Sequence, residues 1–168
     1  MTEKVSITES GMVFGDFDSE SLFHIEKSDV YKKLGDGIKS VEFLYLRDRK
    51  KLMFVEAKKS SPNTDNIEKF EEFIEEITTK FIHSFELWMS LVTKRREADI
   101  AVPLVNPEMD KVNITFVLVI KDHKEEWLPP ITRAINSVMM PYLKIWQSKA
   151  IALNDEIAKK WQLILESA

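Results

Sequence analysis

Cysteine is absent from this 168-residue sequence. The chain therefore has no disulfide scaffold, thiolate zinc site or cysteine nucleophile. Its first residues lack the apolar stretch and small-residue cleavage site of a signal peptide. The most apolar run, residues 114–120, is too short to cross a bilayer. We therefore expect a cytoplasmic protein with no membrane partner.

A surplus of basic residues is also missing. The net charge is −4 and the isoelectric point is about 5.5, whereas proteins that bind nucleic acid through phosphates usually carry excess positive charge. Basic residues nevertheless gather at residues 47–51, 58–59 and 94–96, and acidic residues gather at 65–76. These clusters allow local basic patches, although a mixed, solvated surface is the plainer interpretation.

The composition, with 44% hydrophobic and 31% charged residues, suits one α/β domain spanning residues 1–168. No repeat, low-complexity tract or long linker divides the chain. Apolar residues recur at spacings of three and four over residues 66–97, which predicts a long amphipathic helix with Asp65 and Glu68 as a capping box. Residues 112–120 are mostly β-branched and apolar, which predicts a buried central strand.

The C-terminal third predicts a helix, a strand and a final helix. Pro129 and Pro130 open the first of these helices, and Pro141 is expected to end or kink it. A short strand is expected at residues 149–153, followed by a terminal helix that Asn154 caps.

The N-terminal part is more ambiguous. Residues 5–17 have strand character interrupted by glycines, and residues 22–26 fit either a strand or a helix. Residues 29–34 predict a short helix with Ser28 as its cap and Gly35 at its end.

A β-hairpin is predicted between residues 41 and 58. Its strands, residues 41–46 and 52–58, flank a polar turn at residues 47–51. Apolar side chains alternate onto both faces of both strands. The hairpin should therefore be covered on both sides.

The register of this hairpin decides whether its acids meet. A three-residue loop at residues 48–50 pairs Glu42 with Glu56 and puts both on one face with Lys58. A two-residue loop would place Glu42 opposite Val55 and separate the acids. With the longer loop, two facing carboxylates repel and need a cation or a shared proton. Mg²⁺ or Mn²⁺ suits such a pair, and Lys58 can orient a water or offset developing charge.

These residues carry a resemblance to a known family. The order of these features resembles that of the PD-(D/E)XK nuclease superfamily. The features are an acid, a strand, a turn, a strand with Glu-x-Lys, a long helix and an apolar strand. The resemblance covers roughly residues 20–120 and leaves 121–168 as a C-terminal strand–helix extension. It implies a restriction-endonuclease-like mixed sheet flanked by helices and Mg²⁺-dependent hydrolysis of DNA or RNA. It also implies that Glu42 and Glu56 are metal ligands and that Lys58 is catalytic.

The sequence departs from the family pattern in one place. Val41-Glu42 stands where Pro-Asp is expected, and the longer glutamate moves the carboxylate outward. The family often adds an acid from its first helix. Glu20 and Glu26 both qualify, and Glu26 is taken as a further metal ligand.

Other interpretations stay open. The chain could instead be a non-catalytic interaction protein, immunity-like or regulatory, that binds a protein partner on a nuclease-like scaffold. The acidic net charge favours that view, whereas the retained Glu-x-Lys favours an enzyme. The histidines form no ligand spacing with one another. We expect the four tryptophans to pack in the core rather than to stack on bases.

Overall fold

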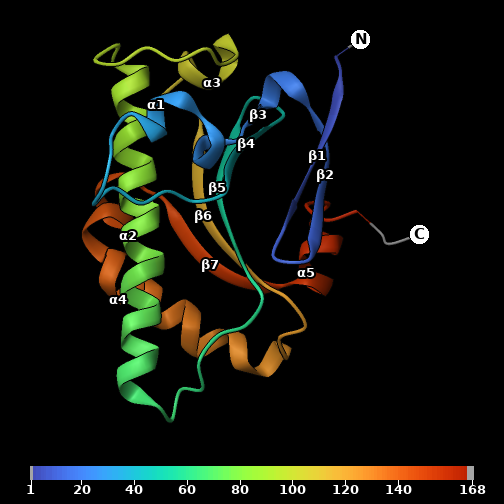
Figure 1. Ribbon diagram of the computed structural model, residues 1–168, viewed down its shortest axis with the longest axis vertical. Coiled ribbons are helices and arrows are strands. Elements are labelled where there is room, and N and C mark those ends of the chain that lie inside the picture. The colour runs from blue at the N-terminus through green and yellow to red at the C-terminus, as the bar shows by residue number, and fades with distance from the viewer. Residues whose placement is uncertain (1, 166–168) are drawn as a thin grey trace.

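The computed structural model describes residues 2–165 and has three layers (Figure 1). A five-stranded sheet forms the middle layer. Helices α2 (Ile67–Val92) and α4 (Leu128–Ile145) cover one face. The hairpin of β1 (Lys4–Glu9) and β2 (Met12–Asp18) covers the other, together with α5 (Asp155–Lys160). The chain is therefore an α/β protein, as the sequence predicted.

The central sheet is mixed, with the strand order β3-β4-β5-β6-β7. Its first three strands are antiparallel, and β5, β6 and β7 are parallel. The bounds of the strands are β3 (Leu22–Phe23), β4 (Phe43–Arg47), β5 (Lys51–Lys58), β6 (Asn113–Ile120) and β7 (Lys149–Asn154). The sequence predicted β6 as a buried central strand, which is confirmed, because both its neighbours are parallel strands.

Short elements join these layers. They are the 3₁₀ turns η1 (Ser19–Ser21), η2 (Ile25–Lys27) and η3 (Glu125–Trp127), and the helices α1 (Asp29–Lys32) and α3 (Val102–Val105). The ambiguous stretch at residues 22–26 is thus a two-residue strand followed by a 3₁₀ turn. Ser28 caps α1 as predicted, since its hydroxyl accepts a hydrogen bond from the backbone N–H of Tyr31.

Helix α2 differs from its prediction at both ends. Its cap is Asn66 rather than Asp65, because the Asn66 side chain accepts a hydrogen bond from the backbone N–H of Lys69. It ends at Val92, five residues before the predicted end at 97, because Lys94 adopts a left-handed φ of 61°. The basic residues after it belong to a loop.

Helix α4 passes through Pro141 and continues to Ile145, so of the two effects expected of this proline, a helix end or a kink, the first is excluded. The C-terminal strand and its cap are confirmed, since Asn154 accepts a hydrogen bond from the backbone N–H of Ile157. Strand β7 extends the central sheet beside β6. No helix among residues 2–165 is long and apolar enough to span a membrane.

Two apolar clusters sandwich the sheet. On the helix side, Phe54 and Phe116 pack against Phe81, Phe85 and Trp88. The opposite cluster joins the other face of the sheet to the β1–β2 hairpin and α5. The β4–β5 hairpin is therefore covered on both faces, as predicted. The prediction of core tryptophans holds for Trp88 but not for Trp127 and Trp146, which are 49% and 39% exposed.

Candidate metal centre

The register of β4 and β5 is the one that the sequence predicted, up to Phe43 opposite Val55. Leu44 lies opposite Phe54, and a turn over residues 48–50 joins the strands, so the three-residue loop predicted from the sequence is confirmed. Glu42 lies one residue before β4, and its backbone N–H donates to the Val55 carbonyl at 3.1 Å. The alternation directs Glu56 toward the helix side of the sheet, which Phe54 also faces.

Both carboxyl groups are buried. Glu56 is 0% exposed and Glu42 is 7% exposed. One oxygen of each, Glu42 Oε2 and Glu56 Oε2, has no hydrogen-bond partner among residues 2–165. A buried carboxylate oxygen without a partner is costly, which makes these atoms candidates for cation binding.

The pKa of each acid rises because of this burial. Burial raises the pKa of Glu42 to about 9, helped by a hydrogen bond to Glu26 and by the charge of Glu56. Burial also raises the pKa of Glu56 to about 7, although the nearby Lys80 opposes the shift. The two acids thus repel each other and hold protons more tightly than free glutamate does.

Helix α2 supplies charges that the sequence reasoning missed. Lys80 Nζ donates to Glu56 Oε1 at 2.8 Å, whereas Lys58 Nζ lies 3.9 Å from the same oxygen. Lys58 instead donates to Glu76 at 2.8 Å. Burial works against the charge of Lys80, yet Glu56 and the neighbouring acids raise its pKa. The only sequence signal was Glu76-x-x-x-Lys80, a spacing that puts both side chains on one helix face.

The structure distinguishes the two candidate N-terminal acids. Glu26 lies in η2 and contributes to the raised pKa of Glu42 through hydrogen bonding and through its charge. Glu20 lies in η1 and is exposed. Of the two, Glu26 is therefore the one that joins Glu42.

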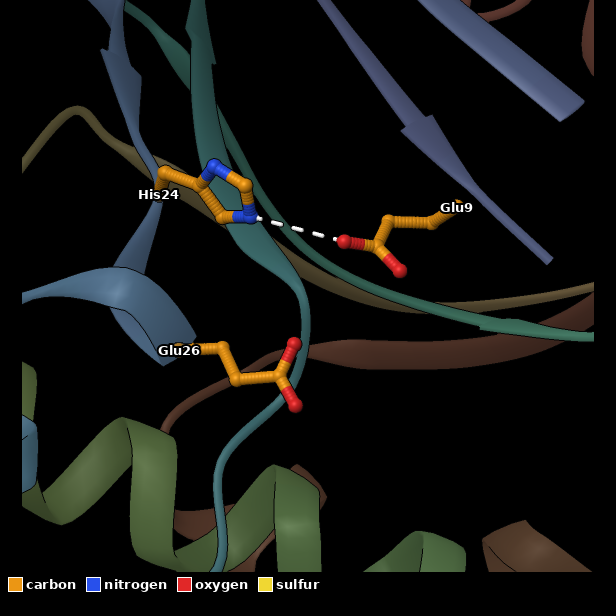
Figure 2. A group of neighbouring side chains, drawn as sticks. All are labelled: Glu9, His24 and Glu26. Atoms are coloured by element: carbon orange, nitrogen blue, oxygen red, sulfur yellow. Dashed lines mark ion pairs between the residues drawn. The ribbon is translucent and has the colours of Figure 1, made fainter.

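Glu26 also belongs to a group with Glu9 and His24 (Figure 2). One potential ligand atom from each of these residues lies within 4.8 Å of the others. His24 Nε2 is 3.7 Å from Glu9 Oε1. Burial lowers the pKa of His24, although Glu9 opposes that shift. The sequence reasoning missed this group because Glu9 comes from a different hairpin.

Local structure explains why these side chains meet. Ile25 is fully buried between His24 and Glu26, so the residues on either side of it turn away from the core. The Ser28 hydroxyl donates to the Ile25 carbonyl at 2.6 Å and closes the η2 turn. At the tip of the β1–β2 hairpin, the Ser10 hydroxyl donates to the Ala57 carbonyl at 3.1 Å. That contact holds Glu9 beside the end of β5.

Glu26, Glu42 and Glu56 offer oxygen ligands, although among the described residues the group whose potential ligand atoms all lie within 4.8 Å of one another is Glu9, His24 and Glu26. Mg²⁺ and Mn²⁺ prefer oxygen ligands and are commonly held by one or two carboxylates with water. The unpartnered oxygens of Glu42 and Glu56 supply such ligands at a place where their negative charges need compensation.

A cavity of about 900 Å³ has His24 in its wall, whereas Glu26, Glu42 and Glu56 are not part of its lining. Its charged lining includes the cations Lys27, Lys33, Arg95 and Arg96 and the acids Asp29, Glu97 and Asp99. The basic turn of the β4–β5 hairpin lies at the other end of the strands, where Arg47 donates to the Trp161 carbonyl. The cavity is therefore lined by the basic residues of the loop after α2 and not by the basic hairpin turn.

No family model matches this chain, and no curated protein and no solved structure matches it either. A function must therefore rest on the chemistry of the site.

Proposed function

We propose that this protein is a divalent-metal-dependent nuclease of the PD-(D/E)XK type. The observation that carries the proposal is the meeting of Glu42 and Glu56 at the end of a covered hairpin, each with an unpartnered buried oxygen. Two lysines and a third acid, Glu26, lie beside them. A carboxylate cluster with neighbouring ammonium groups is suited to charge relief in phosphodiester hydrolysis.

The order of the elements supports the proposal. Strands β3, β4 and β5, helix α2 and strand β6 follow one another as three strands, a helix and a strand. The parallel pairing of β5 with β6 across α2 gives the mixed sheet that the resemblance implied. One departure is that α1 lies between β3 and β4, so the third acid comes from η2 rather than from a helix before the sheet.

Glu26, Glu42 and Glu56 are the residues that would hold Mg²⁺ or Mn²⁺. When bound, such an ion makes a coordinated water more acidic and offsets negative charge on the phosphate. Lys80 donates to the inner oxygen of Glu56, which favours the charged form of that carboxyl and opposes the effect of burial on its pKa. Lys58 is 25% exposed, so its ammonium group can leave Glu76 and reach a phosphate at the surface of the site.

The neighbouring cavity supplies a path for a nucleic acid strand. Lys27, Lys33, Arg95 and Arg96 line it, and so does His24, which lies beside Glu26. Cations in a groove attract phosphates even when the whole chain carries net negative charge.

The alternative function is a non-catalytic interaction protein on this scaffold. The observation that favours it is the ion pair of Lys58 with Glu76 at 2.8 Å, which occupies the lysine expected to act on the substrate. An assay of turnover separates the two functions.

The test uses supercoiled plasmid DNA and structured RNA with Mg²⁺, Mn²⁺ or a chelator. We expect metal-dependent cleavage by the wild type and a loss of roughly 10²–10³-fold in Glu56→Gln, because the metal loses a ligand. Lys58→Met should still bind metal but turn over more slowly. Equal activity in all three proteins would indicate a contaminant. No cleavage of either substrate by the wild type would favour the interaction protein.

A further inference from the structure

We propose that Glu9, His24 and Glu26 form a second cation position that takes a divalent transition-metal ion such as Mn²⁺ or Zn²⁺. This proposal rests on the proposed function only through Glu26, which the second position shares with the carboxylate site of Glu42 and Glu56. Figure 2 shows the three side chains converging from the tip of β1 and from the segment around η2.

The spacing of the three groups supports a shared ion. Two ligands of one ion lie roughly 3.0 to 4.2 Å apart, because each is about 2.1 Å from the metal. His24 Nε2 and Glu9 Oε1 are 3.7 Å apart, which is within this interval and too long for a hydrogen bond. Potential ligand atoms of all three residues lie within 4.8 Å of one another, so a small contraction completes the geometry.

Unpartnered atoms provide an independent observation. His24 Nε2 is buried and has no hydrogen-bond partner in the described part of the chain. Glu42, which is 7% exposed, also keeps Oε2 buried without a partner. A lone ion pair between Glu9 and His24 would leave both atoms unsatisfied. An ion at Glu9, His24 and Glu26 gives His24 Nε2 a partner and places positive charge beside Glu42.

The imidazole sets the preferred metal. Carboxylates alone suit Mg²⁺, whereas a neutral imidazole nitrogen favours the first-row transition metals. The carboxylate site of Glu42 and Glu56 has no such nitrogen ligand. The two positions should therefore differ in selectivity, with Mn²⁺ able to enter both and Mg²⁺ restricted to the carboxylate site.

Glu26 connects the two positions, since it belongs to the His24 group and raises the pKa of Glu42. Paired metals in phosphodiester-cleaving sites are typically about 3.5–4 Å apart. The N-terminal hairpin thus contributes a ligand from outside residues 20–120, the part of the chain that carries the nuclease resemblance.

Pulsed electron paramagnetic resonance on the full chain loaded with Mn²⁺ tests the proposal, because it detects a nitrogen bonded to the ion. We expect ¹⁴N coupling in the wild type and its loss in His24→Gln. His123→Gln is the matched control, because His123 is another partly buried histidine away from the group, and it should keep the signal.

Mn²⁺ titration gives a second readout. Glu9→Gln should weaken one Mn²⁺ position at least tenfold and leave the other, while the matched exposed-acid control Glu20→Gln should match the wild type. Nitrogen coupling that survives in His24→Gln, or that is absent from the loaded wild type, would overturn the proposal. Nitrogen coupling without nuclease activity would leave this metal site standing while the proposed function fails.

Discussion

The helix-facing side of the central sheet contains two regions that are equally buried but opposite in energetic character. In the middle, Phe54 and Phe116 pack against aromatic residues of α2. At the end of β5, the same helix covers Glu56 with Lys80. The first region stabilises the fold by removing apolar surface from water. The second costs stability, because it buries charge and leaves carboxylate oxygens unpartnered.

This difference separates structural burial from burial that supports a function. Leu118 on β6 is the register partner of Glu56, and both are fully buried. A leucine at the position of Glu56 would suit the neighbouring core. A buried acid there, beside a second acid with an unpartnered oxygen, is consistent with a cation-binding role.

The largest expected stability effect is a loss in the apolar region. Leu118→Ala should lower the free energy of unfolding by about 2–5 kcal/mol, because it leaves a cavity between β6 and the helices. Lys58→Ala should cost only about 0–1 kcal/mol, since its ion pair with Glu76 is partly exposed. Urea denaturation measures both. If Lys58→Ala proved the more damaging change, Lys58 would be a structural ion-pair residue.

In the charged region, a substitution should raise the free energy of unfolding rather than lower it. The folded pKa of Glu42 is raised from 4.5 to about 9, so its contribution to stability is fully present below pH 4.5 and is lost as the pH rises toward 9. Glu42→Gln removes this loss. In metal-free buffer, the free energy of unfolding of the variant relative to the wild type should rise between pH 5 and pH 8 by on the order of 4 kcal/mol.

Chemical denaturation at the two pH values, with a chelator present, measures this change. Asp48→Asn is the control, because Asp48 lies in the exposed turn at the other end of the same hairpin. If the difference in the free energy of unfolding between Glu42→Gln and the wild type did not vary with pH, the account of the charged region would be contradicted.

The smallest expected effect concerns the cavity beside the site. In a Glu56→Gln background, which removes turnover, replacing Arg95 and Arg96 by alanine should weaken binding of a single-stranded oligonucleotide about 3–10-fold. The double substitution should also reduce the slope of log affinity against log salt concentration by roughly one for each lost phosphate contact. Fluorescence anisotropy at several salt concentrations provides the measurement. Arg49→Ala, in the exposed hairpin turn, should leave the salt dependence unchanged.

The sequence predicted those parts of the fold and site that depend on local pattern. Alternation and turn length were enough to predict the pairing of Leu44 with Phe54 in the β4–β5 hairpin, and β-branched apolar residues were enough to identify β6. The predicted end of α2 was wrong. The basic residues after Val92 are compatible with a helix, but the chain turns at Lys94. Pro141 does not end α4.

The rest of the site depends on contacts between distant segments. Lys80 reaches Glu56 across 24 residues, and Glu9 reaches His24 only because its hairpin tip docks on Ala57. The spacing of residues along the sequence does not predict such contacts between distant segments. They depend on how the hairpin, the sheet and α2 pack together.

Calorimetric titration of the metal-free protein with Mg²⁺ tests the central claim most directly. We predict binding to the wild type with a Kd in roughly the micromolar to millimolar range, as expected for a site of few carboxylates and several waters. Glu56→Gln should lose this binding, whereas Asp48→Asn should retain it. Equal heats for the wild type and Glu56→Gln would contradict the claim that the buried carboxylates of this hairpin bind a metal ion.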